Sequence, residues 1–376
     1  MSAGSPADGG DVAIRLRGVT KTFPGSTEPA VVPLDLDIAH GEVVVLIGPS
    51  GCGKTTTLRM INRLIEPSGG TISIEGVDVR DRPVTELRRG IGYVIQQVGL
   101  FPHRTISENI ATVPKLLGWN KGRTAERVNE LAELVGLEPR MLDRYPQELS
   151  GGQQQRVGVA RALAADPPVL LMDEPFGAVD PIVRARLQDE LAALQDRVHK
   201  TIVLVTHDID EAIRLGDRVA IMNVGGTLEQ YAPPDEILAK PANRFVEQFL
   251  GAERSLKRLS LSRVGDLALR GDATVGDTDS VEVAQKALAA NGASWIGVVA
   301  DGRFLGWVAQ DDLDPGLPMG DQKLAPPAAQ VEAGSSLREA LEVILNSQTS
   351  RAVVSDGNGR FAGVVSLEEI REGLVR

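Results

Sequence analysis

One short segment has the residue types and the spacing that bind phosphate. It ends in a Gly-Lys-Thr run and reads Gly48, Pro49, Ser50, Gly51, Cys52, Gly53, Lys54, Thr55 and Thr56. The glycines let backbone N–H groups turn toward an anion, and a following helix would direct its positive end at the same point. Lys54 would reach the β- and γ-phosphates, and the Thr55 hydroxyl would bind Mg²⁺. The segment predicts a nucleoside triphosphate site.

Three more polar residues follow strand-like apolar runs. Asp173 and Glu174 end the run from Val169 to Met172, and His207 follows the run from Ile202 to Val205. Ligands bind at the carboxyl ends of the strands in an open parallel sheet, so these side chains belong beside the phosphate loop. We expect Asp173 to hold Mg²⁺ through water and Glu174 to polarise an attacking water. A lone histidine is more often structural, and only its position favours a role for His207.

A second loop has glycines at the start of a helix. It comprises Leu149, Ser150, Gly151, Gly152 and Gln153, and a helical stretch follows through Arg156 to Leu163. A serine and glycines at a helix start make a second anion site. A single nucleotide does not need two such loops from one chain. We therefore expect this loop to cap the γ-phosphate held by a second copy of the protein.

The elements that position these residues follow an α/β pattern. From Val12 to about Leu250, apolar strand-like runs alternate with amphipathic helical stretches, as in a domain with a parallel sheet. The run Val43–Ile47 is uninterrupted, which is typical of a strand buried on both faces. Residues 105–165 are mainly helical and look like an insertion between sheet segments. The predicted fold is an α/β nucleoside triphosphatase domain with a helical insertion.

The remaining chain has a different texture. Residues 1–11 are small, polar and acidic, and we expect a disordered leader. Residues 251–263 are mixed and basic, which suggests a linker. The segment 264–376 contains an internal repeat in which Asp301 corresponds to Asp356, and each copy follows a helical stretch. Two copies are typical of a paired α+β module that closes one core.

Composition excludes several classes of protein. The formal net charge of −11 disfavours nucleic acid as a partner, because phosphate binding needs a basic surface. Cys52 is the only cysteine, so an intramolecular disulfide and a cysteine cluster for a metal are both excluded. The apolar runs are of strand length, well short of the roughly 20 residues that span a bilayer. Any membrane role must then come through a partner.

The order of these motifs resembles the ATPase subunits of ABC transporters. The resemblance covers about Val12 to Leu250, and the loop at 149–153 makes it specific. It implies that Phe23 stacks on adenine and that Gln96, or its neighbour Gln97, senses Mg²⁺ and nucleotide and touches the permease. It further implies contacts of Ser150, Gly151, Gly152 and Gln153 with ATP across a homodimer. Asp180 would link the two sites, Glu174 would be the general base, and His207 would contact the γ-phosphate.

The second half resembles a pair of CBS domains, and the ATPase segments resemble importer subunits for osmoprotectants. This implies ATP and Mg²⁺ as cofactors, membrane permease subunits and an extracytoplasmic binding protein as partners, and a peripheral place on the cytoplasmic face of the membrane. The solutes implied are glycine betaine, choline, carnitine and proline betaine. The alternatives are the same engine for another solute such as an amino acid, a non-transport ABC ATPase, and a nucleotide sensor in which the CBS pair is the functional half.

The CBS resemblance is incomplete where such domains bind adenosine. Nucleotide-binding copies usually have Ser or Thr three residues before an Asp that holds the ribose. Here the first copy has Ala309 with Asp312, and the second has Ser366 with Glu369. A nucleotide, an ionic ligand and a purely structural role therefore all remain open for the pair.

Overall fold

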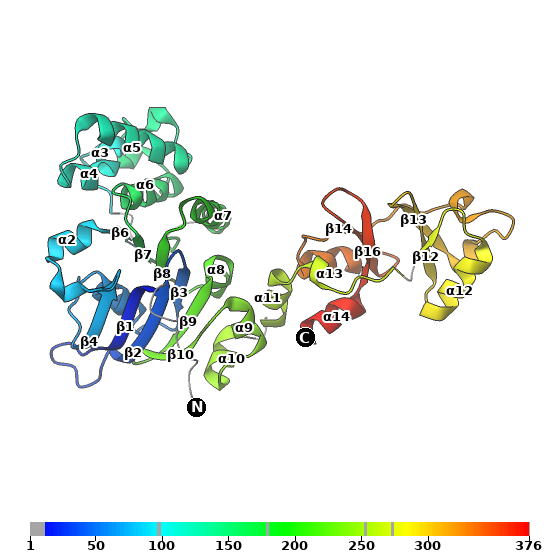
Figure 1. The fold of residues 1–376 in the computed structure, drawn as a ribbon, viewed down its shortest axis with the longest axis horizontal. Coiled ribbons are helices and arrows are strands. Elements are labelled where there is room, and N and C mark those ends of the chain that lie inside the picture. Colours follow the sequence, from blue (N-terminus) through cyan, green and yellow to red (C-terminus); the bar gives the residue numbers. More distant parts are fainter. Residues whose placement is uncertain (1–11, 96–98, 178–179, 252–253, 272–273, 376) are drawn as a thin grey trace. The chain divides into compact units, whose positions relative to one another are not determined.

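The computed structural model describes residues 12–95, 99–177, 180–251, 254–271 and 274–375 (Figure 1). The chain forms two compact units, which divide after Leu250. The expected leader at 1–11 lies outside the described residues. Among the described residues, no helix is both long enough and apolar enough to span a membrane. Each unit is described by itself below.

A six-stranded sheet forms the centre of the first unit. Its strands β3, β8 and β7 lie side by side and are parallel, and every residue in them is buried. Burial on both faces explains their continuous apolar sequences. The strand order is β10-β9-β3-β8-β7-β6. The bounds are β3 Val43–Ile47, β6 Ile91–Val94, β7 Val169–Asp173, β8 Thr201–Val205, β9 Arg218–Asn223 and β10 Thr227–Ala232.

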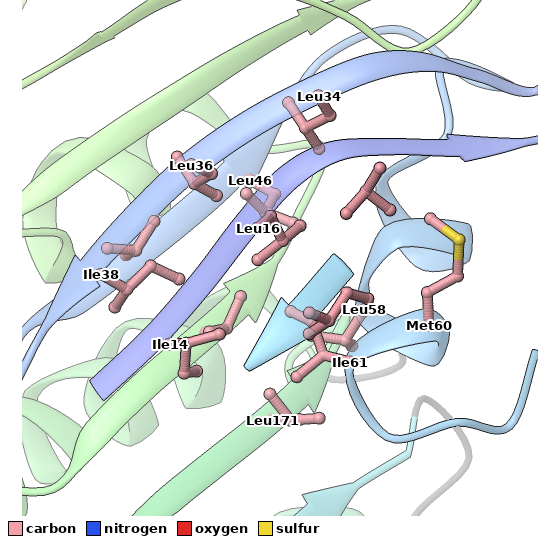
Figure 2. Packing of buried hydrophobic residues seen from close by; sticks show 14 of the residues in the cluster. Ile14, Leu16, Leu34, Leu36, Ile38, Leu46, Leu58, Met60, Ile61 and Leu171 are labelled. Atoms are coloured by element: carbon pink, nitrogen blue, oxygen red, sulfur yellow. The ribbon is translucent and has the colours of Figure 1, made fainter. Parts of the chain in front are cut away.

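A smaller antiparallel sheet supplies the other wall of the core. Its order is β2-β1-β4-β5, with bounds β1 Val12–Lys21, β2 Val31–Ala39, β4 Gly69–Ile74 and β5 Val77–Asp78. Helix α1 (Lys54–Ile61) buries one face in the cluster that joins the two sheets. Figure 2 shows Leu58 and Ile61 of α1 among Ile14, Leu16 and Leu171 from the strands. This packing fixes the helix that follows the phosphate loop.

The predicted helical insertion lies between β6 and β7. In Figure 1 its helices form one group beyond the ends of those strands. Its bounds are α3 Ile106–Ile110, α4 Thr112–Leu116, α5 Lys121–Leu134 and α6 Gly151–Leu163, with the 3-10 helices η2 Pro139–Met141 and η3 Pro146–Glu148. The other helices of this unit are η1 Val79–Asp81, α2 Val84–Arg89, α7 Pro181–Val198, α8 Ile209–Leu215, α9 Pro234–Ala239 and α10 Arg244–Leu250.

The second unit contains the predicted repeat as two three-stranded sheets. In each copy a short strand pairs in parallel with the middle strand, which pairs antiparallel with the last. The first copy comprises β11 Thr274–Gly276, α12 Val281–Asn291, β12 Trp295–Ala300, β13 Arg303–Ala309, η5 Gln310–Asp312 and η6 Met319–Asp321. The second comprises β14 Gln330–Glu332, α13 Leu337–Leu345, β15 Arg351–Ser355, β16 Phe361–Ser366 and α14 Leu367–Val375.

The two copies share an aromatic core. Trp307 is 2 % exposed and packs with Val353 and Val364 of the other copy, and Phe304 lies against Phe361 with ring centroids 5.6 Å apart. The Phe361 N–H donates to the Gly302 carbonyl at 2.9 Å, which ties the copies together. The repeat therefore closes as one paired module.

The segment 251–263 departs from the expected linker. It contains helix α11 (Arg254–Leu261), followed by η4 (Val264–Asp266). Leu259 of α11 is buried in the core of the second copy, and the Ser262 carbonyl accepts a hydrogen bond from the Leu337 N–H. A helix this short is marginal by itself, so its stability depends on packing against α13 and α14.

Candidate nucleotide-binding and catalytic site

The phosphate loop connects the end of β3 to the start of α1. Glycine is required at two of its positions because other backbone comes too close. A Cβ on Gly48 would lie 2.1 Å from the Met222 carbonyl oxygen. Gly53 has φ +91°, and its Cβ would lie 2.6 Å from the Ala30 carbonyl oxygen. The sequence of this loop is thus dictated by the close approach of neighbouring backbone.

The N-terminus of α1 is open to an anion. Its N-cap is Gly53, and no described side chain caps it with a hydrogen bond. The first N–H groups of a helix have no partner within the helix, so they attract negative charge. Lys54 is 7 % exposed, and its Nζ donates to the carbonyls of Gly48 at 2.8 Å and Pro49 at 3.1 Å. The loop's only cation therefore lies folded into the loop itself.

A cavity of about 460 Å³ opens over this loop. It brings the predicted phosphate-binding residues together with both predicted catalytic residues. Its walls are formed by Ala30, Ser50, Gly51, Cys52, Gly53, Lys54, Thr55, Thr56, Glu174 and His207. Gly48 and Pro49 are not among the described lining residues, but their carbonyls accept the hydrogen bonds from Lys54 described above. The volume fits the size range of small-molecule sites.

Asp173 ends β7 directly beneath the first turn of α1. It is 3 % exposed, and its Oδ1 accepts a hydrogen bond from the Thr55 hydroxyl at 2.9 Å. Arg59 Nη2 lies 3.6 Å from the other oxygen, Oδ2. A hydroxyl and a carboxylate in contact are the hard oxygen donors that Mg²⁺ accepts, with phosphate and water completing the shell. Among the described residues, no group of three or more acidic, histidine or cysteine side chains is placed to hold a metal ion.

Glu174 points into the cavity because the chain turns sharply after β7. Its backbone is left-handed, with φ +45°, and its N–H donates to the Val205 carbonyl at 2.9 Å. Its Oε2 lies 3.4 Å from His207 Nδ1. The His207 side chain is 61 % exposed, whereas that of Glu174 is 23 % exposed. The two predicted catalytic residues therefore meet at the wall of this cavity.

A hydrogen-bond network lies behind His207. The Thr206 hydroxyl donates to Glu211 Oε2 at 2.9 Å and accepts from the Asp208 N–H at 3.0 Å. Glu211 is 4 % exposed, and this burial raises its pKa to about 7. The sequence analysis missed Glu211 and Arg59. Their only signals were helical spacing, four residues after His207 and four after Thr55, which is one turn in each case.

The second glycine-containing loop stands apart from this cavity. Ser150 is the N-cap of α6: its Oγ accepts the Gln153 N–H at 3.3 Å, and Gln153 Oε1 accepts the Ser150 N–H at 3.0 Å. Ser150 and Gly151 are exposed, and Gly152 and Gln153 are half-buried. Among the described residues that line the cavity, none comes from this loop.

Three other predicted site residues are not among the described residues that line the cavity. Phe23 is 40 % exposed and is not among the described residues lining the cavity; Lys21 Nζ lies 5.2 Å from its ring centroid. Asp180 precedes α7, is exposed, and its carbonyl accepts the Arg184 N–H at 2.8 Å. Gln96 lies outside the described residues, as does Gln97.

The strand-loop-helix around 48–55, with an acidic pair at the end of the adjacent strand, defines this unit as a P-loop nucleoside triphosphatase. Comparisons with known proteins narrow this class. The sequence matches the family described as ABC transporter over residues 31–177 and the CBS domain over residues 324–376. The CBS match falls on the second copy of the repeat.

Two similar relatives span nearly the whole chain. The osmoprotectant import ATP-binding protein OsmV of Salmonella typhimurium is 47 % identical, over 96 % of this chain and 96 % of that protein. The glycine betaine/carnitine/choline transport ATP-binding protein OpuCA of Bacillus subtilis is 47 % identical, over 94 % of each. A solved dimeric ATP-binding cassette in a post-hydrolysis state, bound to ADP and Pi, is 36 % identical with a TM-score of 0.53, over 58 % of this chain and 98 % of that one.

The chain belongs to the family of ABC transporter ATP-binding proteins. It binds ATP and is an ATPase. The predicted fold class, the ABC resemblance and the CBS resemblance are confirmed.

Proposed function

We propose that this chain is the ATPase subunit of an importer for quaternary-amine osmoprotectants: glycine betaine, choline, carnitine or proline betaine. The observation that carries the proposal is the 47 % identity to OsmV over 96 % of both chains, with the CBS region included. The aligned region covers the CBS pair as well as the ATPase domain. The transported solute would bind to other polypeptides of the complex.

ATP would enter the cavity with its phosphates on the loop. The N–H groups at the start of α1 would receive phosphate oxygens, and Lys54 would exchange its carbonyl partners for the β- and γ-phosphates. The residues that follow, Thr55 and Thr56, line the same wall. Phe23 would stack on adenine, and its 40 % exposure leaves part of the ring accessible for this contact.

Mg²⁺ fits the oxygen pair of Thr55 and Asp173, with Gln96 as a further proposed contact. The metal ion would offset the negative charge of the phosphates. For the chain itself, this means that Thr55 would become a ligand through a lone pair of its hydroxyl oxygen, while its O–H still donates to Asp173 Oδ1. Asp173 is already aligned, because its other oxygen is held by Arg59.

Hydrolysis would use Glu174 and His207. Glu174 would accept a proton from water as that water attacks the γ-phosphorus, and the bond from the γ-phosphorus to the bridging oxygen would break to give ADP and phosphate. His207, 3.4 Å from Glu174, would orient the carboxylate and contact the γ-phosphate. The left-handed turn at Glu174 supports this role, since it directs the carboxylate toward the loop.

We infer that the site is completed by a second copy in a homodimer. Ser150, Gly151, Gly152 and Gln153 lie outside their own chain's cavity although they begin an exposed helix N-terminus. A head-to-tail dimer would place them over the partner's γ-phosphate, with Asp180 linking the two sites. The Ser150 hydroxyl accepts one bond in its cap and keeps its O–H free to donate to phosphate.

The membrane partners follow from the proposed transport role. The chain would sit as a peripheral subunit on the cytoplasmic face of the membrane, bound to permease subunits near Gln96. An extracytoplasmic substrate-binding protein would deliver the solute. Nucleic acid is disfavoured by the net charge of −11.

The CBS pair would regulate transport by binding a nucleotide or by sensing ions. In the second copy, Glu369 is 8 % exposed; it accepts the Ser366 N–H at 2.8 Å and pairs with Arg270 Nε at 2.8 Å. In the first copy, Asp312 is exposed after Ala309. A nucleotide at the second copy would therefore have to compete with Arg270 for the carboxylate. Calorimetry with ATP and AMP on the full chain carrying Lys54→Ala, which suppresses the phosphate loop, tests for this second ligand.

Uptake by the reconstituted complex tests the transport role. The chain and its permease and binding-protein partners would be placed in vesicles with ATP inside the compartment that faces the chain. We expect ATP-dependent uptake of labelled glycine betaine or choline, and loss of uptake with Glu174→Gln. Uptake of an amino acid in place of these amines, with the same dependence on Glu174, would refute the substrate assignment and keep the ATPase assignment.

A further inference from the structure

Asp173 has a basic partner that none of its predicted roles includes. Arg59 lies on α1 one turn after Thr55, and its Nη2 is 3.6 Å from Asp173 Oδ2. The Asp173 side chain is 5 % exposed, whereas that of Arg59 is 47 % exposed. A buried carboxylate without a compensating partner is costly, so this contact offsets part of the cost of burying Asp173.

The two oxygens of Asp173 are held by two residues of the same helix. Thr55 in the first turn of α1 bonds Oδ1 at 2.9 Å, and Arg59 in the second turn contacts Oδ2. With both oxygens engaged, the carboxylate cannot rotate about its last bond without losing a partner. The helix that begins at the phosphate loop thus also fixes the direction of the acid at the end of β7.

Tyr93 forms the third side of this group. It lies on β6, and its strand pairs in parallel with β7. Burial, and then the charge of Asp173, raises the pKa of its hydroxyl, and the neighbouring Arg59 opposes that rise. Arg59 therefore links α1 to the end of β7, with Tyr93 of β6 as a further neighbour.

We propose that Arg59 is a positioning residue that holds Asp173 in the orientation needed for the metal of the nucleotide complex. The inference rests on the proposed Mg²⁺ role of Thr55 and Asp173. When Mg²⁺ and ATP bind, Thr55 would reach the metal through a lone pair of its hydroxyl oxygen, so the contacts that hold both Asp173 oxygens stay. Arg59 then contributes to the part of nucleotide affinity that depends on the metal and leaves the part that depends on the phosphate loop unchanged.

The test compares ATP affinity with Mg²⁺ and with EDTA, by calorimetry on the full chain. For Arg59→Met we expect the metal-free affinity to stay within about twofold, and the gain from Mg²⁺ to fall by about tenfold, as for other residues that orient a metal ligand. Arg59→Lys keeps the charge without the planar fork, and should recover part of the gain. Arg80→Met is the matched control, because Arg80 is 48 % exposed and pairs with Asp78 at 2.8 Å away from the cavity; it should change neither affinity.

Three results would overturn the proposal. An unchanged gain from Mg²⁺ in Arg59→Met would show that Asp173 is held without Arg59. An equal loss of affinity with Mg²⁺ and with EDTA would show a general structural role, and thermal unfolding of the variants would record it. If the wild-type chain itself gained no affinity from Mg²⁺, the proposed metal role of Thr55 and Asp173 would fail, and the inference about Arg59 with it.

Discussion

Two loops of the first unit each lead glycines into a helix, and their helix ends differ. At α1 the N-cap is Gly53, no described side chain caps it, and the N–H groups face a cavity. At α6 the N-cap Ser150 and Gln153 satisfy each other in a capping box, and the loop is exposed. The first helix end is incomplete without an anion, while the second is stable alone. The difference supports the proposed roles, in which the first loop binds nucleotide within its own chain and the second contacts the nucleotide of a partner.

The largest expected effect concerns hydrolysis at the α1 loop. Glu174→Gln should lower kcat by about 10² to 10⁴, because it removes a general base and keeps the size of the side chain. ATP binding should persist, and the chain should accumulate as an ATP-bound dimer. Steady-state ATPase assays and size-exclusion chromatography with ATP measure both. A turnover rate equal to that of the wild type would remove Glu174 from the proposed role.

A mixing experiment tests the α6 loop directly. Lys54→Ala and Ser150→Arg should each abolish most ATPase activity as a homodimer, since every shared site then contains a damaged loop. Mixed dimers regain one site with both loops intact, so an equal mixture should recover about a quarter of the wild-type rate if sites act independently and subunits exchange freely. Ser150→Arg should still bind ATP when dilute. Absence of recovery in dimers shown to be mixed would contradict the shared site.

The network behind His207 should make stability depend on pH. Burial raises the pKa of Glu211 in the folded chain to about 7, well above that of an exposed glutamate. The protonated side chain therefore favours the folded state, and the wild-type chain loses this stabilisation as the pH rises through 7. Glu211→Gln mimics the protonated form. The free energy of unfolding of Glu211→Gln, minus that of the wild type, should therefore increase by roughly 2 to 3 kcal/mol as the pH rises from 5 to 8.5.

Urea unfolding at a series of pH values measures this difference. Asp210→Asn serves as the control, because Asp210 lies on the same helix and is exposed, whereas Glu211 is buried. A difference between wild type and Glu211→Gln that stayed constant from pH 5 to 8.5 would show that Glu211 is not a titrating group in this range.

The smallest effect sharpens the contrast between the two helix ends. Ser150→Ala should cost about 1 kcal/mol through loss of the α6 cap, while an alanine at Gly53 would fail for the different reason of steric conflict with Ala30. Ser336→Ala is a matched control, because Ser336 and Glu339 form the same box on α13 in the second unit. Ser336→Ala should lose similar stability and keep ATPase activity. Thermal unfolding and ATPase assays of the two variants give the comparison.

The sequence was sufficient for the parts of the site that depend on contiguous residues. The loop at 48–55 and the pair Asp173–Glu174 could be placed because buried parallel strands precede both, and the sheet edge brings their ends together. Arg59 could not be assigned, since its partner Asp173 is distant in sequence and the contact depends on where α1 packs. The sequence of α11 suggests a linker because its basic residues obscure the buried Leu259, which becomes stabilising through packing against α13 and α14.

The backbone conformation at Glu174 affects which substitutions selection would favour in this unit. A left-handed conformation at a residue other than glycine costs about 1 to 2 kcal/mol, and here it falls on the proposed general base. Glycine would relieve that strain, but it would remove the carboxylate. Selection for activity and selection for stability are therefore opposed at this position. Variants found by screening for thermal stability alone should include changes at Glu174, and those variants should be inactive.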